Sequence, residues 1–203
     1  MPRSEVRVTP RSARGVRTRS ALIAAARVVF ERDGYLEARL SDISAEAGVA
    51  SGSLYTYFEG KEEIFQAVAE QVTEEMAHPH LRARTGVTDP RELIDLANRE
   101  YLRSYKKNAK LMGLFEQVSQ VDENFREVRI ERANAFIQRN AKMIRDLQQQ
   151  GLADTELDPL LTAHALSSMV SRMAYVAFVQ GTPMPFERLV VTLNRIWVNA
   201  LGL

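Results

Sequence analysis

Hydroxyl-bearing side chains gather in one short segment of the chain, which contains Ser51, Tyr55 and Thr56. If this segment is helical, Leu54 and Phe58 share its inner face and the hydroxyls lie on the other side. Hydroxyl groups bond to phosphate oxygens, and a side chain as small as Thr56 fits against a base edge in the major groove. The segment therefore has the chemistry of contact with duplex DNA, although packing inside a small domain would also account for its tyrosines.

Further residues around this segment offer contacts to phosphate. Gly52 has no side chain to hold the backbone away from a phosphate. Tyr57 adds a hydroxyl at the flank, Lys61 is expected to clamp a phosphate, and Arg39 could reach one from the preceding helix. The predicted DNA-binding residues, which include two arginines nearer the N-terminus, are Arg14, Arg17, Arg39, Ser51, Gly52, Tyr55, Thr56, Tyr57 and Lys61.

Two short apolar-periodic segments must position these residues. The first carries Leu40 and Ile43 on one helical face, and the second carries Leu54 and Phe58 at a similar spacing. Between them a turn of about four residues contains Gly48, a residue type at which helices commonly end. Two short helices joined by such a turn make a helix-turn-helix, whose second helix can enter a major groove.

The same stretch resembles the DNA-binding domain of TetR-type (tetracycline-repressor-type) regulators. The resemblance covers roughly a quarter of the chain closely, and the rest is similar only in length and helical layout. It implies an all-α fold with an N-terminal three-helix DNA-binding domain and a C-terminal helical effector and dimerisation domain. The residues that carry it, in order, are Gly34-Tyr35, Ile43, Ala47-Gly48-Val49, Gly52, Leu54-Tyr55, Tyr57-Phe58 and Lys61-Glu62-Glu63.

Two positions depart from the pattern of the family. Arg39 and Ala50 stand where a Thr or Ser often caps the two short helices, and loss of such a cap costs on the order of 1 kcal/mol. Ser41 and Ser51 could supply the missing caps, with the second helix then starting one residue later. The segment 51–57 also contains no Arg, Asn or Gln. Contacts to phosphates and methyl groups, together with DNA shape, are therefore expected to outweigh bidentate base contacts.

The N-terminus is basic, although the chain as a whole has a net charge of only +1. Residues 1–20 contain six Arg and one Glu, and Pro2 and Pro10 interrupt any helical pattern before about Thr18. Two interpretations remain open: an arm that reaches into a minor groove, or a solvated tail without a partner. The predicted organisation is a flexible basic arm over 1–15, a DNA-binding domain over 16–76 and a ligand-binding and dimerisation domain over 77–203.

Apolar periodicity predicts about nine helices along the chain. Asp89-Pro90 and Asp158-Pro159 are typical helix starts, with Asp as the cap and Pro as the first helical residue. The predicted helices span 18–32, 40–46, 51–57, 61 to about 77, 90 to about 105, 111–118, 123–150, 159–180 and 186–201.

Large, adaptable apolar residues on the later helices are the candidate effector site. In the family such residues wall a cavity between helices, and helical bundles bind ligands in this way. Taken together, they favour a small to mid-sized hydrophobic effector, although plain core packing explains any single one. The predicted pocket residues are Tyr101, Tyr105, Met112, Phe115, Phe136, Met143, Met169 and Met173.

The segment 158–180 is apolar around most of its circumference, which is expected of a helix that is buried or faces a partner. With 186–201 it suits a two-fold interface, as the resemblance also implies, although monomer core remains the alternative. A single DNA-binding domain of this size covers too little DNA for tight specific binding, so a homodimer on double-stranded operator DNA is predicted.

Composition argues against most other functions. The chain has no Cys and only three His, and no serine sits in a nucleophile-elbow motif, so neither an enzyme nor a metal or cofactor site is predicted. No apolar run is long enough to span a membrane, and a cytoplasmic location is expected. The sequence predicts a ligand-responsive repressor released from its operator by a hydrophobic effector, with corepression still open. The alternative is a helical scaffold that does not bind DNA.

Overall fold

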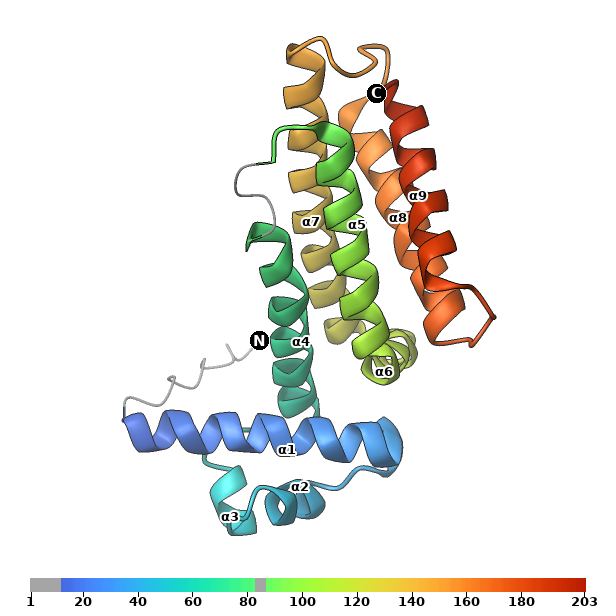
Figure 1. The fold of residues 1–203 in the computed structure, drawn as a ribbon. Helices are drawn as coiled ribbons and strands as arrows, with labels where there is room; N and C mark the ends of the chain where they lie inside the picture. Colours follow the sequence, from blue (N-terminus) through green and yellow to red (C-terminus); the bar gives the residue numbers. More distant parts are fainter. Residues whose placement is uncertain (1–11, 83–86) are drawn as a thin grey trace. The chain divides into compact units, whose positions relative to one another are not determined.

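The computed structural model describes residues 12–82 and 87–203, with side chains over 12–76 and 87–203. Over these ranges the regular structure is entirely α-helical, so the predicted all-α fold is confirmed (Figure 1). No helix in these ranges is both long and apolar enough to cross a membrane. The nine helices so described are α1 (Ala13–Glu37), α2 (Leu40–Glu46), α3 (Ser51–Leu54), α4 (Lys61–Arg82), α5 (Pro90–Lys107), α6 (Ala109–Ser119), α7 (Glu123–Gln149), α8 (Pro159–Phe178) and α9 (Phe186–Leu201).

The chain divides into two compact units, and the boundary falls between Val72 and Thr73, inside α4. The first unit contains α1, α2, α3 and the beginning of α4, and the second contains the rest of α4 and the five helices that follow. The boundary predicted from the sequence, between residues 76 and 77, lies within the same helix.

Helix α1 begins at Ala13, earlier than the predicted start at Thr18. Ser12 is the reason, because its hydroxyl accepts a hydrogen bond from the Gly15 N–H at 3.1 Å and so caps the helix. Residues 13–15, which the sequence assigns to the flexible arm, therefore belong to α1. Residues 1–11 of the predicted arm lie outside the described part of the chain.

An aromatic group lies at the centre of the first unit. Gly34 has a φ of 79°, which interrupts α1 at the predicted stop, and the chain resumes for one further turn to Glu37. Tyr35 follows at once and packs on Phe65 with ring centres 4.6 Å apart, and Phe65 meets Phe30 edge to face at 4.9 Å. The glycine thus turns the tyrosine ring towards the core that α1 and α4 share.

Helix α3 is shorter than predicted. The sequence indicates a helix over 51–57, but α3 ends at Leu54 and the next residues form turns. The amide of Tyr57 donates to the Leu54 carbonyl at 2.9 Å, and that of Thr56 donates to the Ser53 carbonyl at 3.2 Å, both three residues back. Leu54 and Phe58 are nevertheless fully buried, as predicted, because a tight turn also places residues four apart on the same side.

In the second unit, α5, α7, α8 and α9 run side by side and α6 crosses one end of this bundle (Figure 1). Both predicted Asp-Pro starts are confirmed. The Asp89 carboxylate accepts from the Arg91 N–H at 2.9 Å and the Asp158 carboxylate accepts from the Leu161 N–H at 2.8 Å. The local cap chemistry therefore sets where α5 and α8 begin.

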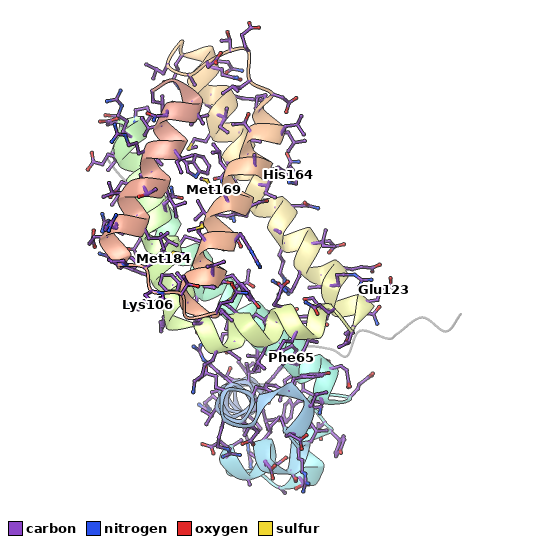
Figure 2. The ribbon with its side chains drawn as sticks, turned by 90° about the vertical axis from the view of Figure 1, so that its right-hand side faces the viewer. Phe65, Lys106, Glu123, His164, Met169 and Met184 are labelled. Carbon is purple, nitrogen blue, oxygen red and sulfur yellow. The ribbon has the colours of Figure 1, made fainter. Side chains whose placement is uncertain are left out.

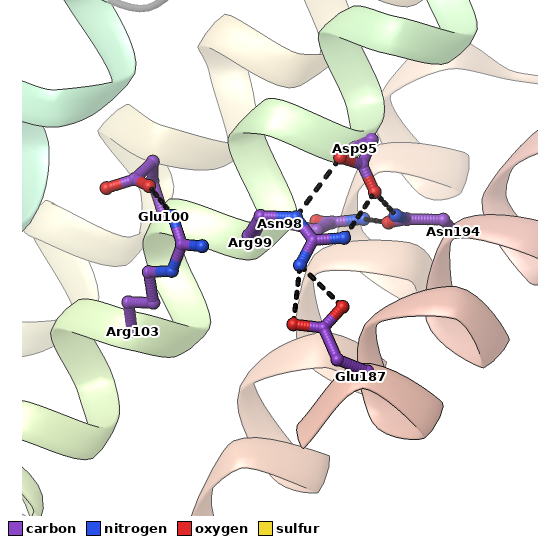
Figure 3. Close-up of polar contacts among 7 residues, drawn as sticks. All are labelled: Asp95, Asn98, Arg99, Glu100, Arg103, Glu187 and Asn194. Atoms are coloured by element: carbon purple, nitrogen blue, oxygen red, sulfur yellow. Dashed lines mark hydrogen bonds and ion pairs between the residues drawn. The ribbon is translucent and has the colours of Figure 1, made fainter. Parts of the chain in front are cut away.

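A polar chain joins α5 to α9 (Figure 3). The side-chain amide of Asn98 donates to Asn194 at 2.9 Å, and that of Asn194 donates to Asp95 at 2.6 Å. One nitrogen of Arg99 reaches both carboxylate oxygens of Glu187, at 2.7 and 2.9 Å. These directional bonds help to set the register between the two helices.

Candidate nucleic-acid interface and effector site

The predicted helix-turn-helix is present in the first unit. α2 ends at Glu46, and Gly48 adopts a φ of 66° in the turn that follows. The Val49 N–H donates to the Ser44 carbonyl at 3.0 Å, which closes the end of α2 before α3 begins. Ile43 and Leu54 are fully buried, so apolar packing fixes the angle between the two helices.

The outer side of α3 and of the turn that follows it carries the predicted contact residues. Ser51, Gly52, Tyr55 and Thr56 are exposed, and Tyr57 is half-buried. Tyr55 keeps 53% of its surface, which is high for an aromatic side chain. Nothing lies within 4 Å of the place where a Cβ on Gly52 would sit, so the backbone there is open to a ligand. The structure thus brings these residues together on one accessible surface.

Neither short helix has a side-chain cap. The residues at the two cap positions, Arg39 and Ala50, make no side-chain bond to the helix ends that follow them. The replacement caps considered from the sequence are not formed either, since Ser41 donates instead to the Asp42 carboxylate at 3.4 Å and α3 starts at Ser51. Arg39 is exposed at the start of α2, where its charge is accessible to an anion.

Lys61 makes internal contacts as well as being a predicted phosphate ligand. Its ammonium group donates to the Leu36 carbonyl at 3.0 Å and to the Ala38 carbonyl at 3.3 Å, and it lies 5.0 Å from the centre of the Tyr35 ring. Lysine has three N–H donors, so these two bonds leave one for another acceptor. The structure therefore gives Lys61 a bracing role between the end of α1 and the start of α4.

Arg14 and Arg17 lie on α1, not on an arm, and both are exposed. The N-terminal half of α1 contacts the end of the turn that follows α3, because the guanidinium carbon of Arg19 lies 5.1 Å from the centre of the Phe58 ring. Sequence reasoning counted Arg19 among the N-terminal charges but did not identify this role, since spacing alone does not reveal which ring it covers.

Most of the predicted pocket residues meet in the second unit. Tyr101 stacks near Phe136, with ring centres 6.1 Å apart, and lies 5.9 Å from Tyr105. Tyr105 is buried in the core cluster, against which Tyr101 and the four predicted methionines Met112, Met143, Met169 and Met173 pack as partly exposed side chains. Figure 2 labels Met169 on α8. Phe115 is buried elsewhere, against Phe125 at the corner between α6 and α7, at 5.9 Å.

Both pocket tyrosines remain neutral at physiological pH. Burial raises the pKa of the Tyr101 phenol, and a hydrogen bond with Ser171 on α8 opposes this in part. Burial also raises the pKa of Tyr105, while the positive charge of Arg129 on α7 lowers it. Phenols in this state are hydrogen-bond donors as well as acceptors. The interior therefore combines adaptable apolar side chains with a small number of neutral polar groups.

Two family models match the chain. The model described as bacterial regulatory proteins of the tetR family matches residues 22–68, which include α2 and α3. The model described as the C-terminal domain of the transcriptional regulator EthR matches residues 95–201, more than half of the chain. The chain belongs to the TetR family of bacterial transcriptional regulators. The resemblance found in the sequence is thereby confirmed.

Three proteins that match most of this TetR-family chain share little sequence identity with it. The HTH-type transcriptional regulator EthR of Mycolicibacterium smegmatis is 22% identical over 200 residues, which are 95% of this chain and 92% of that protein. A candidate TetR-family regulator from Mesorhizobium loti has a solved structure that matches with a TM-score of 0.79 at 20% identity, over 95% of this chain and all of that one. The fatty acid degradation regulator FadR from Bacillus halodurans matches with a TM-score of 0.76 at 18% identity, over 89% and 94%.

The predicted dimerisation helices of this TetR-family chain each present apolar side chains to solvent. Leu161 on α8 keeps 69% of its surface, and Val191 and Ile196 on α9 keep 60% and 41%. The outer side of α8 is less apolar than the sequence suggested, because His164 and Arg172 are also exposed there. The guanidinium carbon of Arg172 lies 5.1 Å from the centre of the Tyr175 ring.

A basic depression on the same unit was not anticipated from the sequence. It measures about 590 Å³ and lies between the end of α5 and the start of α9. The ammonium group of Lys106 lies 6.0 Å from the centre of the Phe186 ring, which forms part of its wall, and Figure 2 labels Lys106 there. The two helices are far apart in the sequence, so only the fold brings these residues together. Its lining residues are Arg103, Lys106, Lys107, Phe186 and Glu187.

Proposed function

We propose that this TetR-family regulator is a repressor that leaves its operator when a small hydrophobic effector binds to the second unit. The observation that carries the proposal is the exposed polar surface of α3 and the turn after it, with Ser51, Gly52, Tyr55 and Thr56 outside and Leu54 fully buried beneath. An exposed segment held rigidly from behind is suited to reading a groove. Such a regulator works in the cytoplasm, where the chromosome is.

In the proposed complex, α3 enters a major groove and Tyr57 lies at its flank. Arg14, Arg17, Arg39 and Lys61 bind phosphates, Lys61 through the donor that its two carbonyl contacts leave unused. The segment 51–57 has no Arg, Asn or Gln, so sequence is read through thymine methyl groups and the shape of the DNA. A second DNA-binding domain is needed, placed one or more turns of DNA away.

The second DNA-binding domain comes from a homodimer formed through α8 and α9. The exposed side chains of Leu161, Val191 and Ile196 support this interface, since a contact through α8 and α9 would remove these large apolar groups from water. The two DNA-binding domains of a dimer must bind half-sites whose spacing is about 34–36 Å or a multiple of that distance. An effector that alters the packing of these helices would alter the spacing and so the fit to the operator.

The proposed effector site is the interior around Tyr101, Tyr105 and Phe136, lined further by Met112, Met143, Met169 and Met173. Methionine side chains adapt to the shape of an apolar ligand. The name of the Bacillus halodurans relative, a fatty acid degradation regulator, agrees with an apolar effector but supports only that general class.

A gel-shift titration tests the proposal. The full chain is incubated with the duplex upstream of its own gene at several salt concentrations, and a library of apolar compounds is then added to the complex. Binding that weakens steeply with salt, and an effector that releases the DNA, are the expected results. Binding that an effector only strengthens would indicate a corepressor, and absence of salt-sensitive binding would show that the chain is a scaffold.

A further inference from the structure

The buried side chain of Trp197 on α9 has an unusual hydrogen-bonding state. Trp197 is the single tryptophan of the chain, and only 4% of its surface is exposed. Its indole N–H is the one buried side-chain polar group, among the described residues, for which the protein supplies no partner. Buried tryptophan N–H groups ordinarily find an acceptor. The exception therefore requires an explanation.

Other buried polar side chains of the described residues are satisfied. Asn98 donates to Asn194 at 2.9 Å, Asn140 donates to Ser167 at 3.0 Å, and Asn108 donates to the Ser104 carbonyl at 2.9 Å. An indole nitrogen only donates, so it has no second way to form a bond. A donor left in this state has lost its hydrogen bond to water without gaining another, a cost that a phenylalanine at the same place would avoid.

The position of Trp197 places this donor inside the second unit. It follows Asn194 by one turn of α9, and Asn194 is tied to α5 through Asn98 and Asp95 (Figure 3). Trp197 therefore lies on a helix that these hydrogen bonds hold against α5. Trp197 belongs to the same apolar cluster against which Met169 and Tyr101 pack, so a molecule bound in the proposed effector site would reach the same cluster.

The charges around this cluster limit the kind of acceptor. None of the buried polar residues in the described part of the chain is a lysine or arginine. The positive charge that acts on the phenols of Tyr101 and Tyr105 is that of Arg129 on α7, which is only partly buried and already pairs with Glu116 at 3.3 Å. A carboxylate or phosphate brought into the cluster would lose its hydration without gaining a buried counter-ion, which is strongly unfavourable. A neutral oxygen acceptor, such as the carbonyl of a ketone, ester or amide, has a much smaller desolvation cost.

We infer that the effector is an apolar molecule with a neutral carbonyl-type oxygen, which accepts the hydrogen bond from Trp197 Nε1. This inference rests on the proposed function and names the ligand class for its effector site. The nitrogen has almost no accessible surface, so side chains over it must move when the ligand enters. The partly exposed methionines of the cluster have the flexibility to do so.

Because the chain has one tryptophan, its indole signal can be followed without ambiguity. The full-length protein, labelled with ¹⁵N, is titrated with 2-octanone, and the indole N–H resonance and tryptophan fluorescence are recorded. The matched probe is 1-chlorooctane, which has the same number of heavy atoms but is a poor acceptor. The ketone is expected to move the indole proton downfield, as hydrogen bonding does, and the chloroalkane is expected to leave it near its starting position.

Two variants separate the hydrogen bond from packing. Trp197→Phe keeps a ring but removes the donor, and it is expected to weaken ketone binding by about 3- to 10-fold, the value of one net hydrogen bond, with little change for the chloroalkane. Met173→Leu, which changes the cluster without removing a donor, is expected to affect both probes alike. Binding to these variants is followed by ligand-detected NMR, since Trp197→Phe has no indole signal.

Different results would overturn different claims. An indole proton that is already downfield in the ligand-free protein would mean that a buried water occupies the donor, and the inference would be wrong. Equal binding of both probes, unaffected by Trp197→Phe, would also refute it, while leaving a ligand-responsive domain in place if the probes release operator DNA. If neither probe binds, the domain accepts no apolar ligand of this size and the proposed function fails as well.

Discussion

The guanidinium group of Arg19 covers the ring of Phe58, with its central carbon 5.1 Å from the ring centre. Phe58 is fully buried and ends the turn that follows α3. The contact therefore joins the N-terminal half of α1 to the segment predicted to read DNA, and α1 supports that segment through more than its apolar face. Arg17, two residues earlier on the same helix, is exposed, so the two arginines are expected to differ in function.

Replacement of Arg19 by Met should lower the stability of the first unit. The substitution keeps most of the apolar stem but removes the charge over Phe58, and a cation–π contact at a partly exposed site is worth about 0.5–1 kcal/mol. Urea denaturation followed by circular dichroism measures the change in the free energy of unfolding. An unchanged midpoint would mean that the ring contact is not formed in solution.

Replacement of Arg17 by Ala should leave stability unchanged and weaken DNA binding. If Arg17 binds a phosphate, its loss reduces affinity for specific and unrelated duplexes alike, and the slope of log K against log salt becomes shallower by about 1. Fluorescence anisotropy at several salt concentrations measures both quantities. A slope identical to that of the unmodified chain would exclude a phosphate contact at this position.

Replacement of Ala50 by Ser should stabilise the first unit. Ala50 has the extended backbone of a cap residue, with φ −63° and ψ 139°, but it has no side-chain oxygen to accept from the first N–H groups of α3. A serine there is expected to add about 0.5–1 kcal/mol to the free energy of unfolding. Thermal denaturation provides the measurement, with Ala45→Ser, an exposed position inside α2, as the control that should not stabilise.

The features that could be predicted from the sequence are the local ones. The Asp89 and Asp158 caps act on N–H groups two or three residues away, so residue order reveals them. The length of α3 could not be predicted in this way, because Leu54 and Phe58 would be buried in a helix or a turn. The true start of α1 was missed because the capping role of Ser12 is hidden among the arginines and prolines of the N-terminus.

Contacts between residues far apart in the chain could not be predicted from the sequence. The position of Lys61 after the helix-turn-helix predicts a phosphate ligand, but it does not reveal the carbonyl partners of Lys61, Leu36 and Ala38, which lie more than twenty residues earlier. The unsatisfied N–H of Trp197 is likewise a property of the packed bundle, since an apolar pattern places the ring inside without indicating what the nitrogen meets. Spacing predicts which face is buried but not which atoms meet there.

Replacement of Asn98 by Ala should destabilise the second unit much more than loss of a nearby ion pair. Asn98 is buried and donates to Asn194, so its removal leaves the Asn194 oxygen without this donor and should cost about 1–3 kcal/mol. The matched control is Arg103→Ala, which removes an exposed pair with Glu100 on the same helix and should change stability by less than about 1 kcal/mol. Equal effects in chemical denaturation would contradict this ranking.

Stability should decrease in alkaline solution because of Tyr105. Burial raises the pKa of its phenol above the ordinary value of 10.0. Above about pH 10 the unfolded chain therefore loses the proton while the folded chain keeps it, so the unfolded state binds fewer protons and the free energy of unfolding falls as pH rises. Below pH 10 both states are protonated and no such dependence is expected.

Urea midpoints measured between about pH 9 and pH 11, on either side of the ordinary tyrosine pKa, provide the test. Tyr105→Phe removes the ionising group and should reduce the alkaline loss of stability, although the variant has its own stability at neutral pH. Tyr55→Phe changes an exposed tyrosine and should leave the pH dependence as it is. If the phenolate absorbance of Tyr105 developed near pH 10 in the folded chain, the hydroxyl would be in contact with water, and the apolar interior around Tyr101 and Tyr105 would be open to solvent.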